Sequence, residues 1–210
     1  MEIKINNTVV EEKTSTKYLG TFIDTHLKWD IQIQHIKTKL AKGIGMISRI
    51  RYYVDKACLQ KMFYSFVQSH INYNILNWSC TRESVLSPIE KKLKKAIRII
   101  SFSETMYEHT DPLFKQHKIL PFKQHVMLRK AIFMWKLTKG YMPDVVKKLF
   151  TPNLHNQLKF VLPHPGSDRA KLHLVYSCIT AWNYVPDTLK TMTTLSNFSV
   201  KYKEYLLNRL

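Results

Sequence analysis

The sequence predicts a mainly α-helical protein with a small N-terminal β element and a short α+β tail. Apolar residues recur at helical spacing through most of residues 30–140. Alternation with a period of two, which is typical of strands, is confined to short segments near the two ends. Pro, Gly, Asn and Asp cluster over residues 151–170 and indicate a boundary. We therefore expect three parts, spanning residues 1–27, 28–150 and 151–210.

The first part should be β structure. Residues 2–5 and 8–10 flank Asn6-Asn7. Because Asn tolerates a positive φ, this arrangement predicts a short hairpin. The segment Lys17–Ile23 alternates between its two faces, which predicts a third strand before the turn-like residues 24–26.

A long amphipathic helix should follow, beginning near Asp30, which suits an N-cap or a first-turn position. Its apolar stripe consists of Ile33, Ile36, Leu40, Ile44, Ile47 and Ile50. The opposite side carries His35, Lys39, Lys42 and Arg49. One face of this helix is therefore suited to a core and the other to anions.

Further helices are indicated by their capping residues. Asp55 should cap one helix, and Ser87-Pro88 should begin the next, because Pro is favoured at the first helical position. Asp111-Pro112 should open a short helix that ends at His117. A longer helix over residues 121–139 should end at Gly140. It is apolar nearly all round, so we expect it at the centre of the core.

In the tail, Leu172, Leu174 and Tyr176 alternate as a short strand would, and residues 195–210 fit a final amphipathic helix. Of the four tryptophans, we expect Trp29 to be partly exposed. The other three should pack in the core.

The strongest clue to function is the run of residues 91–98, in which five of eight side chains are cationic. Winding it as a helix places Leu93 in an apolar stripe and most cations on the opposite side. Glu90 is the only acid expected in that helix, so we expect that i,i+4 pairing with Glu does not neutralise these cations. The alternative is an ordinary solvated face. The candidate binding residues are Lys39, Lys42, Arg49, Lys91, Lys94, Lys95 and Arg98.

Whole-chain composition supports an anionic partner. The 210 residues include 33 Lys and Arg against 15 Asp and Glu, giving a formal net charge of +18 and a pI near 9.8. Nucleic acid is the commonest such partner, with an anionic membrane surface as the competitor. Three cysteines without a Cys-x-x-Cys pair indicate neither a disulfide framework nor a zinc site. The absence of a signal sequence and of a long apolar run predicts a soluble, intracellular protein, cytoplasmic or nuclear.

Several motifs occur together in a recognisable order. They are Lys17-Tyr18-Leu19-Gly20, Ile23-Asp24, Leu27 and Trp29, the Tyr64 to Trp78 stretch, Lys95-Ala96-Ile97-Arg98-Ile99-Ile100, His109-Thr110-x-Pro112-Leu113-Phe114 and Trp182-Asn183-x-x-Pro186. This order resembles the downstream end of jockey-type non-LTR retrotransposon reverse transcriptases, which are RNA-directed DNA polymerases. The resemblance implies that residues 1–27 are the edge of the palm and that residues 28–150 are a helical thumb. The thumb would hold an RNA or DNA template-primer by its phosphate backbone.

Catalysis in that family requires palm carboxylates that hold Mg²⁺. This chain has no Asp-Asp pair, so it contains no catalytic residue, metal ligand or cofactor site that we can name, and Mg²⁺ is expected only in the missing palm. We therefore expect the chain to be inactive alone. It departs from the family at Ser69, where a Pro is usual, and at Cys178, where a Gly is usual. The alternative is a basic helical interaction or anionic-membrane-surface module without enzymatic role. The oligomeric state stays open.

Overall fold

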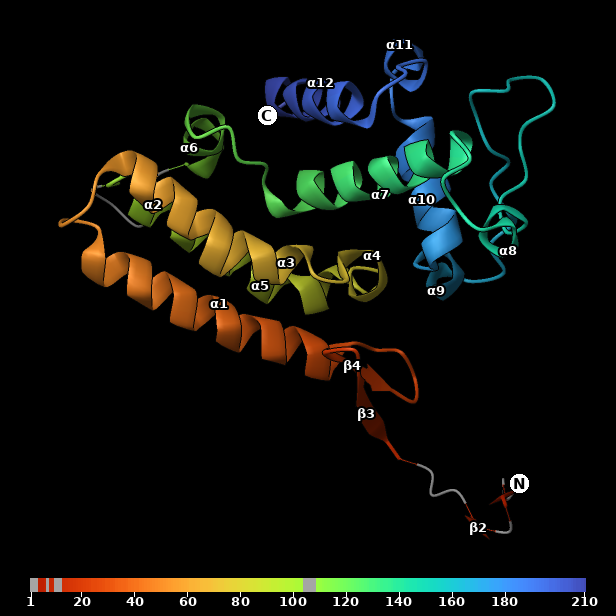
Figure 1. Cartoon of the computed structure of the whole chain (residues 1–210), viewed down its shortest axis with the longest axis horizontal. Coiled ribbons are helices and arrows are strands. Elements are labelled where there is room, and N and C mark those ends of the chain that lie inside the picture. The colour runs from red at the N-terminus through yellow and green to blue at the C-terminus, as the bar shows by residue number, and fades with distance from the viewer. Residues whose placement is uncertain (1–3, 7, 10–12, 104–108) are drawn as a thin grey trace.

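The computed structural model describes residues 4–6, 8–9, 13–103 and 109–210, and these are mainly helical, as predicted (Figure 1). The strands are β1 (Lys4–Ile5), β2 (Thr8–Val9), β3 (Ser15–Tyr18) and β4 (Thr21–Asp24). The first helices are α1 (Asp30–Ile50), α2 (Lys56–Phe63), the π-helical η1 (Tyr64–Gln68), α3 (Ser69–Asn72), α4 (Ile75–Trp78) and α5 (Glu83–Ile100). The later helices are α6 (Thr110–Gln116), α7 (Phe122–Thr138), α8 (Asp144–Lys147), α9 (Asp168–Lys171), α10 (Leu174–Asn183), α11 (Asp187–Lys190) and α12 (Leu195–Asn208).

The N-terminal β element consists of two antiparallel pairs. β1 pairs with β2 across Asn6, whose φ is 47°, in agreement with the predicted hairpin. Asn7 and the ends of that hairpin lie outside the described residues. The prediction of a single strand over Lys17–Ile23 is wrong, because Leu19 and Gly20 adopt φ values of 45° and 78° and turn the chain back on itself. The result is the hairpin β3–β4.

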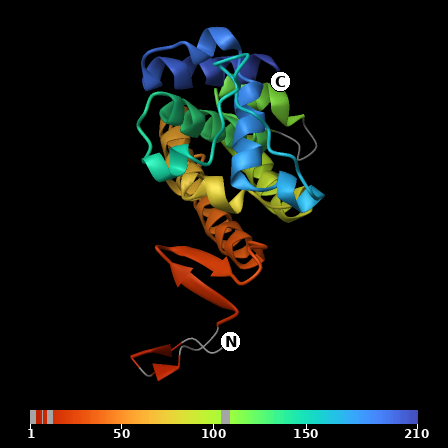
Figure 2. The same ribbon diagram turned by 90° about the vertical axis from the view of Figure 1, so that its right-hand side faces the viewer.

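The β3–β4 hairpin is anchored to the start of α1 (Figure 2). The Asp24 carboxylate accepts hydrogen bonds from the backbone N–H groups of Lys28 and Trp29, each at 2.9 Å, and of His26 at 3.1 Å. Burial alone would raise the pKa of this carboxyl, but these backbone hydrogen bonds outweigh it and lower the pKa. Phe22 N–H also donates to Gln32 Oε1, at 3.0 Å. Tight local bonding therefore fixes the direction in which α1 leaves the hairpin.

One core lies among α1, α2, η1, α3 and α5, which run side by side (Figure 1). The apolar stripe of α1 is buried there, including Leu40 and Ile47. Trp29 is also buried, with 8% of its surface exposed, so the prediction of a partly exposed Trp29 is wrong. Leu27 and Trp29 both have positive φ values, so the chain turns sharply where it enters α1.

Three of the predicted helix boundaries test the capping signals. Asp55 caps α2 as expected, since its carboxylate accepts from Cys58 N–H at 2.6 Å. Gly140, with a φ of 82°, follows the end of α7, also as expected. However, α5 begins at Glu83 and not at Ser87-Pro88, so Pro88 lies inside the helix. The helix therefore contains Glu83 as well as Glu90, which corrects the expectation of a single acid.

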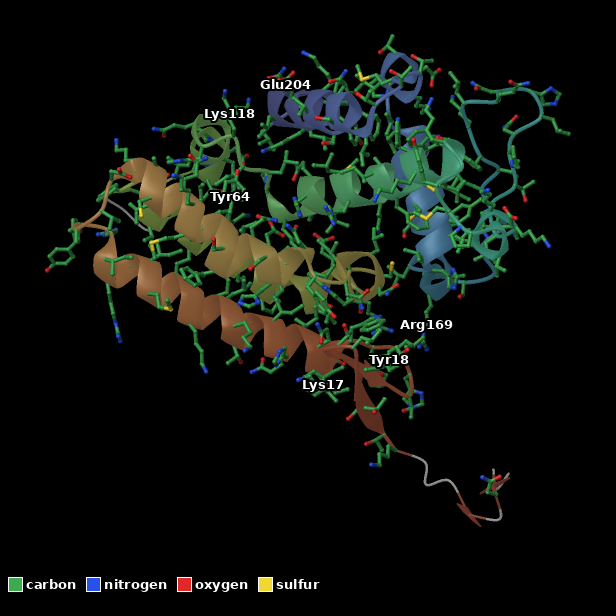
Figure 3. The ribbon with its side chains drawn as sticks, in the orientation of Figure 1. Lys17, Tyr18, Tyr64, Lys118, Arg169 and Glu204 are labelled. Carbon is green, nitrogen blue, oxygen red and sulfur yellow. The ribbon has the colours of Figure 1, made fainter. Side chains whose placement is uncertain are left out.

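A second core lies among α7, α10 and α12, and includes Trp135, Trp182 and Phe198. The predicted strand over residues 172–176 is wrong. Leu174 begins helix α10, because Leu174, Cys178 and Trp182 are spaced by four residues and pack on the same core. The guanidinium of Arg169, from the nearby α9, donates to the carbonyl oxygen of His26 at 2.6 Å (Figure 3). This bond links the tail to the loop that precedes α1.

Candidate nucleic-acid interface

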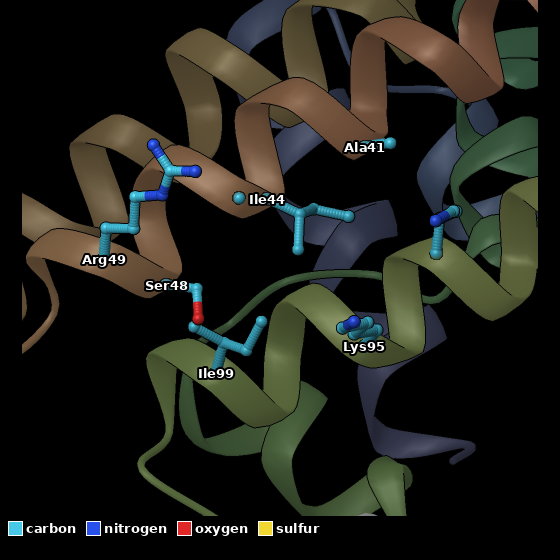
Figure 4. A pocket seen from close by; sticks show the side chains of 8 residues that line it. Ala41, Ile44, Ser48, Arg49, Lys95 and Ile99 are labelled. Carbon is cyan, nitrogen blue, oxygen red and sulfur yellow. The ribbon is translucent and has the colours of Figure 1, made fainter.

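The main surface feature of the basic region is a groove of about 280 Å³ between α1 and α5 (Figure 4). It is lined by Ala41, Ile44, Gly45, Ser48, Arg49, Lys92, Lys95 and Ile99. Arg49 and Lys95 belong to the two cationic stripes that the sequence predicted on separate helices. The structure brings these two residues together on one face of the molecule, which we call the α1–α5 face.

The groove forms because of the residue sizes along α1. Ala41, Gly45 and Ser48 recur at intervals of four and three residues, and so lie on one side of the helix. The apolar stripes beneath them are buried, with Leu40 and Leu93 at 0% and 1% exposure. Small side chains above a packed interface leave a depression that long Lys and Arg side chains can border.

On α1, the candidate residues divide between two sides. Lys42 and Arg49 are exposed, and a separation of seven residues places them within about 20° of each other around the helix. Lys39 is exposed on the other flank, where its charge lowers the pKa of His70 on α3, although desolvation of that imidazole is the larger cause. Lys39 therefore belongs to a separate cluster with His35 and His70, not to the groove.

On α5, Lys91 and Lys95 are exposed and lie one turn apart. Lys94 forms an i,i+4 ion pair with Glu90 at 3.0 Å. Pairing with an acid therefore does neutralise one of the candidate cations, contrary to the expectation for the set as a whole. Arg98 is half-buried near the end of the helix.

Sequence reasoning missed Lys92 as a site residue, although it lines the groove beside Lys95. Lys92 lies at the border between the apolar stripe and the outer cationic side of α5, so neither pattern selected it. One signal could have found it. Lys92 and Lys95 have i,i+3 spacing, and the small residues of α1 form a complementary stripe. Only the pairing of α1 with α5 brings the two together.

The chemistry of the described residues offers little beyond charge. No group of three or more His, Cys, Asp or Glu side chains that could hold a metal occurs within the described ranges. The three cysteines are free, and burial raises the pKa of Cys178 to about 12, so its thiol is protonated at neutral pH. Across residues 4–6, 8–9, 13–103 and 109–210, the helices are all too short or too polar to cross a membrane.

Comparisons with protein-family models, with curated proteins and with solved structures found no match to this chain.

Proposed function

We propose that the α1–α5 face binds the phosphate backbone of nucleic acid without reading its sequence. The observation that carries this proposal is the convergence of Arg49, Lys92 and Lys95 on one groove. Residues 31–54 contain no Asp or Glu, so α1 has no acid beyond its first residue, Asp30. Contacts between cations and phosphates position a duplex but carry no sequence information.

The resemblance to non-LTR retrotransposon reverse transcriptases supplies a biological role within this proposal. The chain would be the thumb and C-terminal portion of an RNA-directed DNA polymerase, without its catalytic palm. A thumb binds the template-primer behind the site of synthesis. The side-by-side α1 and α5, with cations facing outward, are compatible with that task.

The competing role, binding to an anionic membrane surface, requires a helix that exposes both cations and apolar side chains. The apolar stripes of α1 and α5 are instead packed against each other and against α2. This use of the apolar faces favours nucleic acid over lipid as the partner.

Salt dependence tests the proposal. If Lys42, Arg49, Lys91, Lys92 and Lys95 neutralise about five phosphates, log affinity for a duplex should fall with log salt at a slope near −4.5. Affinity should then drop roughly 10² to 10³-fold between 50 and 200 mM salt. Fluorescence anisotropy of a labelled duplex measures this slope, and a slope near zero would contradict the proposal.

A matched pair of double variants tests the groove itself. Lys92 and Lys136 are half-buried, and Lys95 and Lys148 are exposed, so K92E/K95E and K136E/K148E change equal charge at similar exposure. The first should reduce affinity on the order of 100-fold at 50 mM salt and flatten the slope by about 1.8. The second, in α7 and after α8, should weaken binding only a few-fold. Equal losses would show that net charge binds and that the groove does not.

A further inference from the structure

Beyond the groove, the turn between α1 and α2 carries two prominent aromatic side chains. Tyr52 is 69% exposed and Tyr53 is 87% exposed. Tyr is enriched at surfaces that contact a partner, because its ring is apolar and its hydroxyl end is polar. None of the described hydrogen bonds, ion pairs or ring contacts involves the side chain of Tyr53, although its backbone N–H donates to Ile50 at 2.9 Å. Its ring therefore projects from an ordered turn.

The neighbouring Tyr52 is held in place by its surroundings. The Arg51 guanidinium lies 4.5 Å from the centroid of the Tyr52 ring and 5.7 Å from that of Phe102, which follows α5. The rings of Tyr52 and Phe102 meet edge to face at 5.9 Å. Arg51 Nη2 also donates a hydrogen bond to the Tyr52 hydroxyl. Tyr52 thus presents a fixed ring with a cation against it.

These aromatic residues lie at one end of the groove. The groove lining ends at Arg49 on α1 and at Ile99 on α5. Tyr52 and Phe102 each follow those positions by three residues, and the contact between their rings joins the two helix ends. A phosphate backbone that follows the groove toward these ends therefore reaches the aromatic side chains directly.

Exposed aromatic rings beside cations are the usual means by which proteins hold unpaired bases. Stacking depends on the π face that every base has, so it needs no particular sequence. Paired bases inside a duplex do not offer that face. We propose that Tyr52 and Tyr53, with Arg51, form a stacking platform for unpaired bases at the end of the α1–α5 groove. This inference rests on the proposed function and narrows the ligand to a duplex that continues into a single strand.

The experiment uses the full chain and two labelled ligands, a blunt duplex and the same duplex with a single-stranded overhang of about six nucleotides. The overhang should strengthen binding about tenfold, and a 2-aminopurine within it should lose fluorescence on stacking. Y53A should remove most of the advantage of the overhang without changing affinity for the blunt duplex. Y53F, which keeps the ring, should behave as the native protein does.

Two controls separate the platform from the groove. Tyr184 is 67% exposed in the tail, and Y184A should leave both ligands unaffected. K92E/K95E should weaken both ligands together. If the blunt duplex binds with the expected salt slope but the overhang adds nothing, the platform is wrong and the proposed function stands. If neither ligand binds, both are wrong. Loss of binding of Y53A to phosphatidylserine vesicles, with overhang binding intact, would assign these rings to lipid instead.

Discussion

Two regions of this protein both carry an excess of positive charge, but their acids pair differently. Residues 30–103 contain 13 Lys and Arg against four Asp and Glu, and residues 139–210 contain ten against four. In the second region each of the four acids pairs with a Lys three residues away, at 2.8 to 3.3 Å. In the first region Asp55 caps a helix, Glu90 pairs with Lys94, and Glu83 pairs with Lys123 of α7, so only Glu90 pairs within the region. Net charge alone therefore does not show which cations lack a paired acid.

The two regions differ in where their Asp and Glu side chains lie and which cations they pair with. Pairs of Asp or Glu with Lys on exposed helix ends contribute little stability but cancel the local field. On the α1–α5 face no acid pairs with a cation of the groove: Asp30 and Glu83 lie in the first turns of α1 and α5, and Glu90 pairs with Lys94, which does not line the groove. The cations of the groove consequently face solvent without neighbouring anions on α1.

A large effect is expected where the two regions meet. His125 on α7 lies against the first region, with its Nε2 atom 2.6 Å from Asn72 Oδ1 and 2.9 Å from Gln68 Nε2. Desolvation, aided by the charges of Arg129 and Lys203, lowers its pKa to about 4. A folded-state pKa below the unfolded value of about 6.5 gives stability that is complete above pH 6.5 and is lost as pH falls toward 4.

We therefore expect the native protein to lose about 1–2 kcal/mol of unfolding free energy between pH 7 and pH 5 through this residue. H125Q retains a polar side chain without a titrating ring, so it should lose less over the same range. Urea unfolding at both pH values measures the difference. An identical pH dependence in H125Q would mean that protonation of His125 does not weaken the junction.

The next effect concerns the packing beneath the α1–α5 face. A Cβ atom on Gly43 would lie 2.5 Å from the carbonyl oxygen of Phe66, in the π-helical segment η1. G43A should therefore cost about 2 kcal/mol, because two backbones must separate. Gly45, two residues away, has no atom within 4 Å of such a Cβ. G45A should instead stabilise α1 by up to about 1 kcal/mol. Thermal unfolding of both variants gives the comparison, and similar stabilities would show that α1 and η1 can move apart freely.

The smallest effect tests whether the two regions differ only in acid pairing. E90Q removes the partner of Lys94 and should tighten nucleic-acid binding about two- to threefold at low salt. D168N breaks the equivalent exposed pair with Lys171 in the second region and should leave binding unchanged. Anisotropy titrations at 50 mM salt resolve such differences. Equal tightening by both variants would remove the distinction between the regions.

Much of the helical framework could be predicted from local signals. The start of α1, the Asp55 cap and the end of α7 depend on a few neighbouring residues, so the sequence indicates them directly. The predicted start of α5 was wrong because a proline near the start of a helix suggests the first helical position. In the structure four residues of α5 precede Ser87. Leu172, Leu174 and Tyr176 alternate over too few residues to distinguish a strand from a helix.

The candidate site was predictable only as two separate stripes. The two stripes meet because α1 packs beside α5, and no local sequence pattern indicates this tertiary contact. The same packing includes Lys92 and leaves Lys39 on the opposite flank with His35 and His70. The burial of Trp29 likewise accompanies positive φ values at Leu27 and Trp29, which the sequence pattern does not indicate.

The anchoring of the β3–β4 hairpin has a mechanical consequence. The bonds to α1 and α4 come from the β4 side, through Phe22, Asp24 and the hydroxyl of Thr21, which accepts from Asn74 at 3.1 Å. Strand β3 is held mainly by its four paired residues along β4. Tension applied upstream of Thr14 would peel β3 away one pair at a time, starting with the hydrogen bond from Thr25 N–H to the carbonyl oxygen of Thr14. The hydrogen bonds of Phe22 and Asp24 at the start of α1 would stay intact. Tension on the N-terminal chain would therefore not reach the helices.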